Sequence, residues 1–261
     1  FSLPAEEAAA IEQVLTWNDA VVLVVSSGGG VDLSPWADRV PAILYAWYAG
    51  QNGATAVAQV LSGSVNPSGK LPITIERRFE HSPGYGYLPP GEVLYTGWAE
   101  DNFTHREYDV VYREGVFVGY RWYEHLGIEP LFAFGHGLSY TAFEYGDLAL
   151  STDRLAAGEP LGVTFTLENS GTVDGAETAQ LYVRDVISSQ PRPPKELKGF
   201  SKVMLDAGAY RQVQLTLDDR AFSFWHEDRK QWIVEPGRFE IQIGPSSADI
   251  RLRGYVEVVD E

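Results

Sequence analysis

The sequence predicts an α/β segment followed by an all-β sandwich, and three observations support this prediction. Over the first 75 residues, apolar runs typical of buried strands alternate with helical patterns. From Phe143 onward the hydrophobic pattern has period two, and turn signals separate short runs. The 261 residues, 44% of them hydrophobic, are enough for about two domains with cores of their own.

The α/β segment is expected to open with a helix. Pro4 suits the first helical position, and Glu6 and Glu7 suit the positive end of the helix dipole. Apolar residues at helical spacing follow on one face, and the helix should end near Asn18.

Two apolar runs, residues 20–25 and 40–47, predict strands of a parallel sheet. The first run is continuous and rich in β-branched residues, which is typical of a strand buried on both faces of a sheet. A second helix is expected over residues 54–61, with Gly63 as its C-terminal cap. Two strands make a poor α/β domain, so we expect part of this domain to be missing from the chain.

Residues 76–140 show little periodicity and many Gly, Pro and Tyr, which predicts a long ordered connector with short elements. Beyond it, roughly seven short strands without a helix are expected. This pattern is typical of an antiparallel sandwich of the immunoglobulin or fibronectin type III kind.

Charge and composition exclude several classes of function. The 20 Lys and Arg against 36 Asp and Glu give a net charge of −16, which disfavours binding to nucleic acid or to a membrane surface. No apolar run approaches a membrane span, and the N-terminus lacks a signal-peptide pattern. The chain has no Cys, so the compartment stays open, with a secreted or periplasmic location slightly favoured over a cytoplasmic one.

Local motifs give little evidence for a cofactor or metal. The glycine-rich stretch 26–30 follows a strand but lacks the Lys-Ser/Thr pair of a phosphate loop, so a tight strand exit is favoured. The five histidines show no pairing at ligand spacing. We therefore expect neither a cofactor nor a metal.

One cluster in the connector has the composition of a substrate-proximal site. Trp98, His105, Arg106 and Glu107 combine an aromatic ring with charged and hydrogen-bonding groups. A solvated loop explains this cluster, and so does the border of a sugar site, where aromatic rings stack on pyranose faces. Both interpretations stay open from the residues alone.

Several longer motifs, taken together and in order, resemble one family. They are AWYAGQNG at 46–53, LSGSVNPSGKLP at 61–72, EGVFVGYRWY at 114–123, PLFAFGHGLSYT at 130–141 and PRPPKELKGF at 191–200. The sequence resembles the C-terminal part of family 3 glycoside hydrolases, the β-glucosidase and β-xylosidase group.

The resemblance implies a domain organisation. Family members carry an N-terminal barrel, an α/β sandwich and a fibronectin-like domain. Residues 1–80 would be the second half of the α/β sandwich, residues 81–141 an ordered connector, and residues 142–261 a fibronectin type III-like domain. The preceding barrel would then be a partner of this chain. A homodimer is a further possible assembly.

The resemblance also implies an activity. The family hydrolyses terminal β-linked sugars with retention, using two carboxyl groups about 5 Å apart. Both are expected upstream of residue 1, so no catalytic residue is assigned here and the chain alone should be inactive. Gly135-His136-Gly137 is expected to form a tight turn around a buried histidine. The alternative is a non-catalytic sandwich module that binds carbohydrate or protein.

Overall fold

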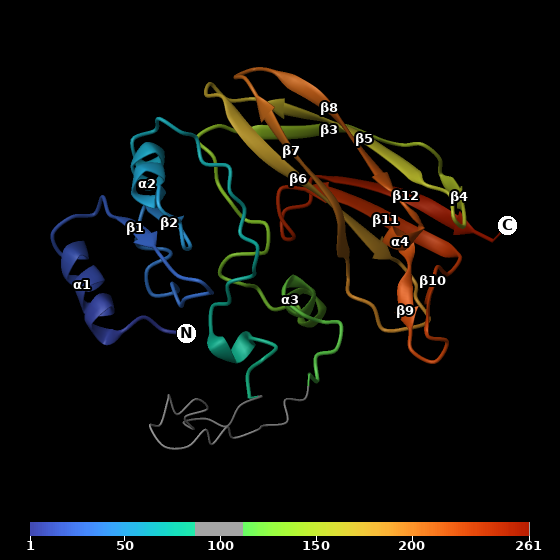
Figure 1. Cartoon of the computed structure of the whole chain (residues 1–261), viewed down its shortest axis with the longest axis horizontal. Helices are drawn as coiled ribbons and strands as arrows, with labels where there is room; N and C mark the ends of the chain where they lie inside the picture. Colours follow the sequence, from blue (N-terminus) through green and yellow to red (C-terminus); the bar gives the residue numbers. More distant parts are fainter. Residues whose placement is uncertain (87–111, 261) are drawn as a thin grey trace.

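The computed structural model describes residues 1–86 and 112–260, and it confirms the predicted fold class of an α/β segment followed by a β-sandwich (Figure 1). The helices are α1 (Ala5–Leu15), α2 (Gly53–Leu61), the 3-10 turn η1 (Phe79–His81), α3 (Tyr120–Leu126) and α4 (Asp219–Phe222). The strands are β1 (Val22–Val25), β2 (Ala42–Tyr45), β3 (Phe143–Leu150), β4 (Arg154–Ala156), β5 (Leu161–Asn169), β6 (Gly175–Asp185), β7 (Glu196–Leu205), β8 (Tyr210–Leu217), β9 (Phe224–His226), β10 (Gln231–Ile233), β11 (Gly237–Gly244) and β12 (Leu252–Val259).

The α/β segment contains a two-stranded parallel sheet. Strands β1 and β2 pair from Val22 opposite Ala42 to Val25 opposite Tyr45. Helix α1 begins directly after Pro4, as its N-terminal signals predict, and α2 lies within one residue of the predicted helix.

Strand β1 corrects one expectation from the sequence. Leu23 and Val25 pack against the small buried cluster Val31, Leu33, Trp36 and Val40. Val22 and Val24, which point to the other face, are 44% and 45% exposed. The prediction of a strand buried on both faces is therefore wrong for this chain, because no described element covers the outer face.

The sandwich consists of two facing sheets. One has the order β4-β12-β11-β6-β7 and the other the order β3-β5-β8. All neighbours are antiparallel except β4 and β12, which pair in parallel. The alternation predicted for β5 is confirmed, since Leu161, Val163, Phe165 and Leu167 are fully buried.

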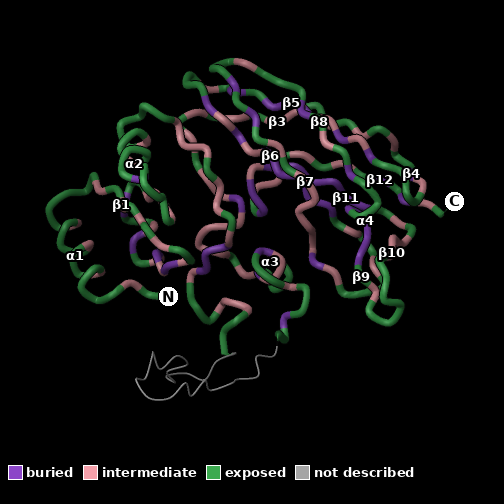
Figure 2. The backbone as a smooth tube through the Cα atoms, in the orientation of Figure 1, coloured by how far each residue is buried: buried purple, intermediate pink, exposed green. Residues whose placement is uncertain are grey.

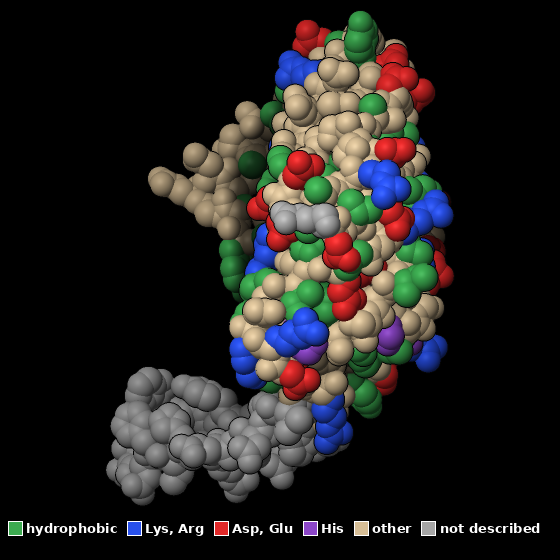
Figure 3. All heavy atoms as spheres, turned by 90° about the vertical axis from the view of Figure 1, so that its right-hand side faces the viewer, with side chains coloured by type: hydrophobic (Ala, Val, Ile, Leu, Met, Phe, Trp, Pro, Cys, Tyr) green, Lys and Arg blue, Asp and Glu red, His purple; other side chains and the backbone are tan. Residues whose placement is uncertain are grey.

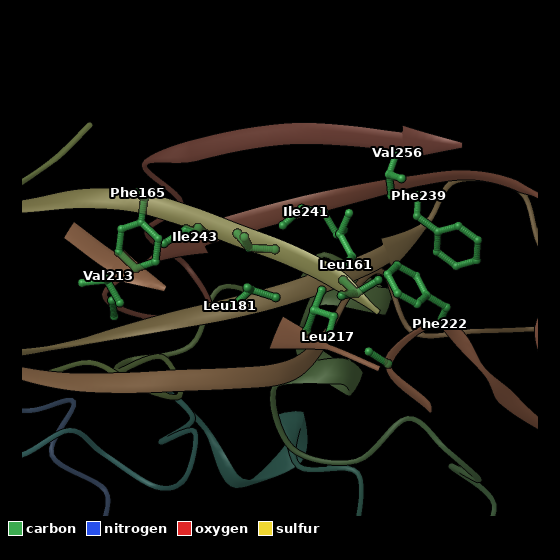
Figure 4. Packing of buried hydrophobic residues seen from close by; sticks show 14 of the residues in the cluster. Leu161, Phe165, Leu181, Val213, Leu217, Phe222, Phe239, Ile241, Ile243 and Val256 are labelled. Atoms are coloured by element: carbon green, nitrogen blue, oxygen red, sulfur yellow. The ribbon is translucent and has the colours of Figure 1, made fainter. Parts of the chain in front are cut away.

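The main hydrophobic core lies between these two sheets. Figure 4 shows side chains from both sheets and one from α4, Phe222, meeting there: Leu161, Phe165, Leu181, Val213, Leu217, Phe222, Phe239, Ile241, Ile243 and Val256. Phe222 and Phe239 meet edge to face, with ring centroids 5.3 Å apart. Burial is concentrated here, whereas α1 has no buried residue (Figure 2).

Two elements of the sandwich differ from the all-strand prediction. A helical turn, α4, follows β8 and is capped by Asp218, whose side chain accepts a hydrogen bond from the Ala221 amide. Strands β9 and β10 then form a short hairpin outside both main sheets. The expectation of a sandwich without a helix is therefore wrong in this region.

Backbone hydrogen bonds join the segment just before the connector to the C-terminal end of the connector. Leu71 donates to the His136 carbonyl at 2.8 Å and accepts from the Gly135 amide at 2.8 Å. Ile75 and Phe132 form an isolated antiparallel bridge. Among the helices of the described ranges, none is long and apolar enough to cross a membrane.

Candidate functional site

The carboxyl edge of the β1–β2 sheet carries the first candidate site. Because β1 and β2 are parallel, the loops that follow them leave the sheet at the same edge, where α/β proteins bind ligands. Ser26 donates its hydroxyl to the Trp47 carbonyl at 3.0 Å, and Tyr45 donates its hydroxyl to the Gly29 carbonyl. These two bonds hold the loops against each other.

Aromatic rings line this edge. The rings of Tyr45 and Trp47 lie 4.6 Å apart, and Tyr48 is 81% exposed. The Tyr48 ring lies against Gly28, where a Cβ atom would stand only 2.6 Å from it, so a larger residue at position 28 would displace this exposed ring. Burial raises the pKa of Tyr45, which therefore stays a hydrogen-bond donor at neutral pH. The edge thus presents apolar ring surface together with fixed polar groups.

A charged cluster joins α3 to the sandwich and forms a second candidate region. Glu196 forms ion pairs with Arg192 at 3.0 Å and with Arg121 at 3.3 Å. Arg192 also pairs with Asp185 at 3.1 Å. Burial acts to raise the pKa of Glu196, but the cations Lys198, Arg192 and Arg121 together lower it. The carboxylate is therefore charged at neutral pH.

Helix α3 contributes two further contacts at this junction. The Tyr120 hydroxyl accepts a hydrogen bond from the Leu197 amide at 2.8 Å. Glu124 pairs with Lys195 at 2.8 Å, and burial raises the pKa of Glu124 against the effect of that lysine. The motif at 191–200 therefore holds α3 against the sandwich, and its side chains Arg192, Lys195 and Glu196 are engaged in ion pairs.

A cavity of about 490 Å³ opens beside this cluster. Its walls include Thr74, Tyr123, Glu124, Lys195 and Asp249. The Thr74 hydroxyl is buried and has no hydrogen-bond partner in the described part of the chain. The lining mixes both signs of charge.

The motif Gly135-His136-Gly137 forms a close backbone contact with the segment that ends the α/β part. A Cβ atom on Gly137 would stand 2.2 Å from the Gly69 carbonyl oxygen. Lys70 donates to the Gly137 carbonyl at 3.0 Å and pairs with buried Glu177. His136 is half-buried rather than fully buried, and burial, then Lys70, lowers the pKa of its imidazole.

The predicted substrate-proximal residues are not placed by the structure. Trp98, His105, Arg106 and Glu107 lie outside the described residues, in the stretch 87–111 of the connector. Within residues 1–86 and 112–260, no group of three or more His, Cys, Asp or Glu could hold a metal ion. Sequence reasoning missed the aromatic edge at Tyr45 and Tyr48, although the run AWYAGQNG had already been noted as a motif.

Comparison with known proteins decides the family. The Glycosyl hydrolase family 3 C-terminal domain matches residues 1–120, and the Fibronectin type III-like domain matches residues 177–247. "Thermostable beta-glucosidase B" of Acetivibrio thermocellus is 44% identical over 98% of the chain. The chain belongs to glycoside hydrolase family 3. Its match is to the C-terminal part of that family, as the sequence resemblance had indicated.

Further family 3 relatives agree over the same length. "Beta-glucosidase BoGH3A" of Bacteroides ovatus is 38% identical over 96% of the chain. The solved structure of the Bifidobacterium adolescentis GH3 beta-glucosidase matches with a TM-score of 0.87 at 36% identity, over 98% of this chain and 36% of that one. Both curated relatives are much longer than this chain, which spans 32% of each.

Proposed function

We propose that this chain is the C-terminal part of a retaining β-glucosidase that releases terminal β-linked glucose. The observation that supports this most is the continuous similarity to proteins named beta-glucosidase, at 38 to 44% identity over 95% or more of the chain. The family 3 resemblance assigns both catalytic carboxylates to sequence before residue 1. The chain therefore supplies framework and substrate contacts, and a preceding segment that carries the barrel and the first half of the α/β sandwich completes the enzyme.

The exposed face of the α/β part supports a partner of this kind. Val22 and Val24 on β1 are about half exposed, although the strand is apolar throughout. An apolar strand face normally packs against another layer of the domain. A preceding segment of the same enzyme would provide that layer.

Activity assays on nitrophenyl β-glucoside test the proposed function. The 261-residue chain alone is expected to give no turnover. The chain combined with the preceding segment of a family 3 enzyme, which carries the barrel and the first half of the α/β sandwich, is expected to be active. Faster hydrolysis of the glucoside than of the matching β-xyloside would support the glucose assignment. Turnover by the isolated chain, or a complete assembly that cleaves no β-glucoside, would contradict the proposal.

The carboxyl edge of the parallel sheet is proposed to face the substrate pocket. Stacking of a sugar on Tyr48 is worth about 1 kcal/mol, so Tyr48→Ala should raise KM about five-fold in the complete enzyme and change kcat little. Tyr210→Ala, which removes a similarly exposed ring from β8, is the control. Equal effects of the two substitutions on KM would contradict the placement of Tyr48 in the pocket.

The connector residues named above remain a separate proposal. Trp98, His105, Arg106 and Glu107 are proposed to border the pocket mouth or a homodimer interface. Trp98→Ala in the complete enzyme should raise KM several-fold or convert a dimer to a monomer in sedimentation experiments. Unchanged KM together with unchanged mass would contradict both versions.

A further inference from the structure

The hairpin of β9 and β10 places two tryptophans side by side on its outer face. Trp225 and Trp232 are directly opposite each other across the two strands, with ring centroids 5.5 Å apart and planes inclined at 58°. They are 45% and 48% exposed. The neighbouring pair, Phe224 and Ile233, points the other way, and Phe224 is buried. The hairpin therefore keeps an aliphatic-aromatic pair inside and presents both indoles to solvent.

Helix α4 holds one of these rings in place. The Arg220 guanidinium lies directly over the Trp232 ring, in a cation–π contact. Trp232 is thus covered on one face by Arg220 and flanked by Trp225. A ring held in this way loses little conformational entropy when a ligand binds, which favours binding.

The surroundings of the tryptophan pair carry balanced charge. The turn of the hairpin consists of Glu227, Asp228, Arg229 and Lys230, all exposed, with two charges of each sign. On the side of the sandwich shown in Figure 3, acidic and basic side chains are likewise interspersed among apolar ones. Such a surface does not favour a strongly charged partner, but its charged groups can hydrogen-bond to hydroxyls.

We propose that the Trp225–Trp232 pair is a non-catalytic binding surface for the sugar rings of a β-linked glucan. The apolar face of a pyranose would stack on the indoles, and its hydroxyls would bond to the charged side chains of the turn. The choice of a glucan rests on the proposed β-glucosidase function.

Affinity electrophoresis of the 261-residue chain in gels that contain cereal mixed-linkage β-glucan tests this proposal. The wild-type chain should be retarded in β-glucan and not in dextran, an α-linked glucan. Trp225→Ala and Trp232→Ala should each weaken retardation about five- to ten-fold, as expected from the loss of one stacked ring. Tyr210→Ala, which removes an exposed ring from β8, should leave retardation unchanged.

Two further measurements keep the outcome interpretable. If an alanine variant unfolds, as judged by circular dichroism, Trp225→Phe and Trp232→Phe replace it and should weaken binding about two- to three-fold. Sedimentation of the wild-type chain checks the other occupant, a second copy of the chain. A dimer that Trp225→Ala converts to a monomer would overturn the proposal.

The result also separates this inference from the proposed function. Absence of wild-type retardation, or retardation that survives removal of both indoles, overturns the binding surface even if the complete enzyme hydrolyses nitrophenyl β-glucoside. Retardation that depends on both indoles supports the surface even if the complete enzyme proves inactive on that substrate. In an active enzyme, Trp225→Ala should leave hydrolysis of this small substrate unchanged.

Discussion

Replacing Arg192 by methionine is expected to destabilise the protein strongly. The Arg192 side chain is 7% exposed, and its guanidinium contacts Asp185 at 3.1 Å, Glu196 at 3.0 Å and the Phe222 carbonyl at 3.0 Å. Asp185 is even less exposed, at 3%. Methionine fills much of the same space but leaves the buried Asp185 carboxylate without its cation. It also removes one of the cations that pair with the partly buried Glu196.

The expected loss is about 3–5 kcal/mol, the range found when one partner of a buried ion pair is removed. In a urea titration with a slope of about 2–3 kcal/mol/M, such a loss lowers the midpoint by about 1–2.5 M. Circular dichroism of the wild-type and variant proteins measures that shift directly.

Arg184→Met is the matched control. Arg184 is 48% exposed and approaches Glu240 at 3.4 Å, so its removal should cost less than about 1 kcal/mol. If the two variants lose the same free energy of unfolding, burial does not decide the contribution of these ion pairs, and the reasoning is refuted.

The difference between wild type and Arg192→Met should also depend on pH. Burial raises the pKa of Asp185 even beside Arg192, and removal of Arg192 raises this pKa further. The folded variant therefore gains stability as the pH falls through that raised pKa, because the buried carboxylate becomes neutral. Burial acts to raise the pKa of Glu196, but the nearby cations lower it below its usual range. The ion pairs of Glu196 therefore stabilise the wild type at neutral pH, and this stabilisation is lost as the pH falls and Glu196 is protonated. The difference in midpoint should therefore be smaller near about pH 4 than at pH 7. A difference that grows toward acid would contradict this account.

Gly137→Ala should destabilise the protein by several kcal/mol, because its Cβ would stand 2.2 Å from the Gly69 carbonyl oxygen, whereas Gly146→Ala has open space and should change stability by less than about 0.5 kcal/mol. Urea midpoints of the two variants check this, and similar values would contradict it. Phe165→Ala, in the fully buried core, should cost about 3–5 kcal/mol, and Phe200→Ala, at a ring that is 66% exposed, should cost less than about 0.5 kcal/mol. Thermal unfolding distinguishes them, and a larger loss for Phe200→Ala would be inconsistent with the packing described.

Local sequence patterns predicted the elements that pack against other parts of this chain. Strand β5 alternates strictly between core and surface, and its core residues are fully buried, because β5 is central in its sheet and faces the other sheet. Helix α1 carried its own start signals in Pro4 and the two acids that follow. Asp218 before α4 is also a local signal, because aspartate is a favoured N-cap residue, but the period-two pattern around it predicts only strands.

The rest depended on contacts between distant parts of the sequence. The ion pair of Glu124 with Lys195 joins residues about 70 positions apart, and no local periodicity marks it. The β9–β10 hairpin turns through Glu227 to Lys230 without Gly or Pro, and Asp228 alone is a weak turn signal. The aromatic edge at Tyr48 depends on two loops meeting, which follows from the pairing of β1 with β2.

The hydrogen bonds between Ile75 and Phe132 and between Leu71 and His136 have a consequence for proteolysis and for chain length. They close the long excursion from residue 75 to residue 132 at its base, so the α/β part and the sandwich are held together independently of the chain between them. Doubling the length of such an excursion adds only about 0.6 kcal/mol of closure entropy. A single cut within it should leave both pieces associated, and insertions there should leave the relative position of the two parts intact.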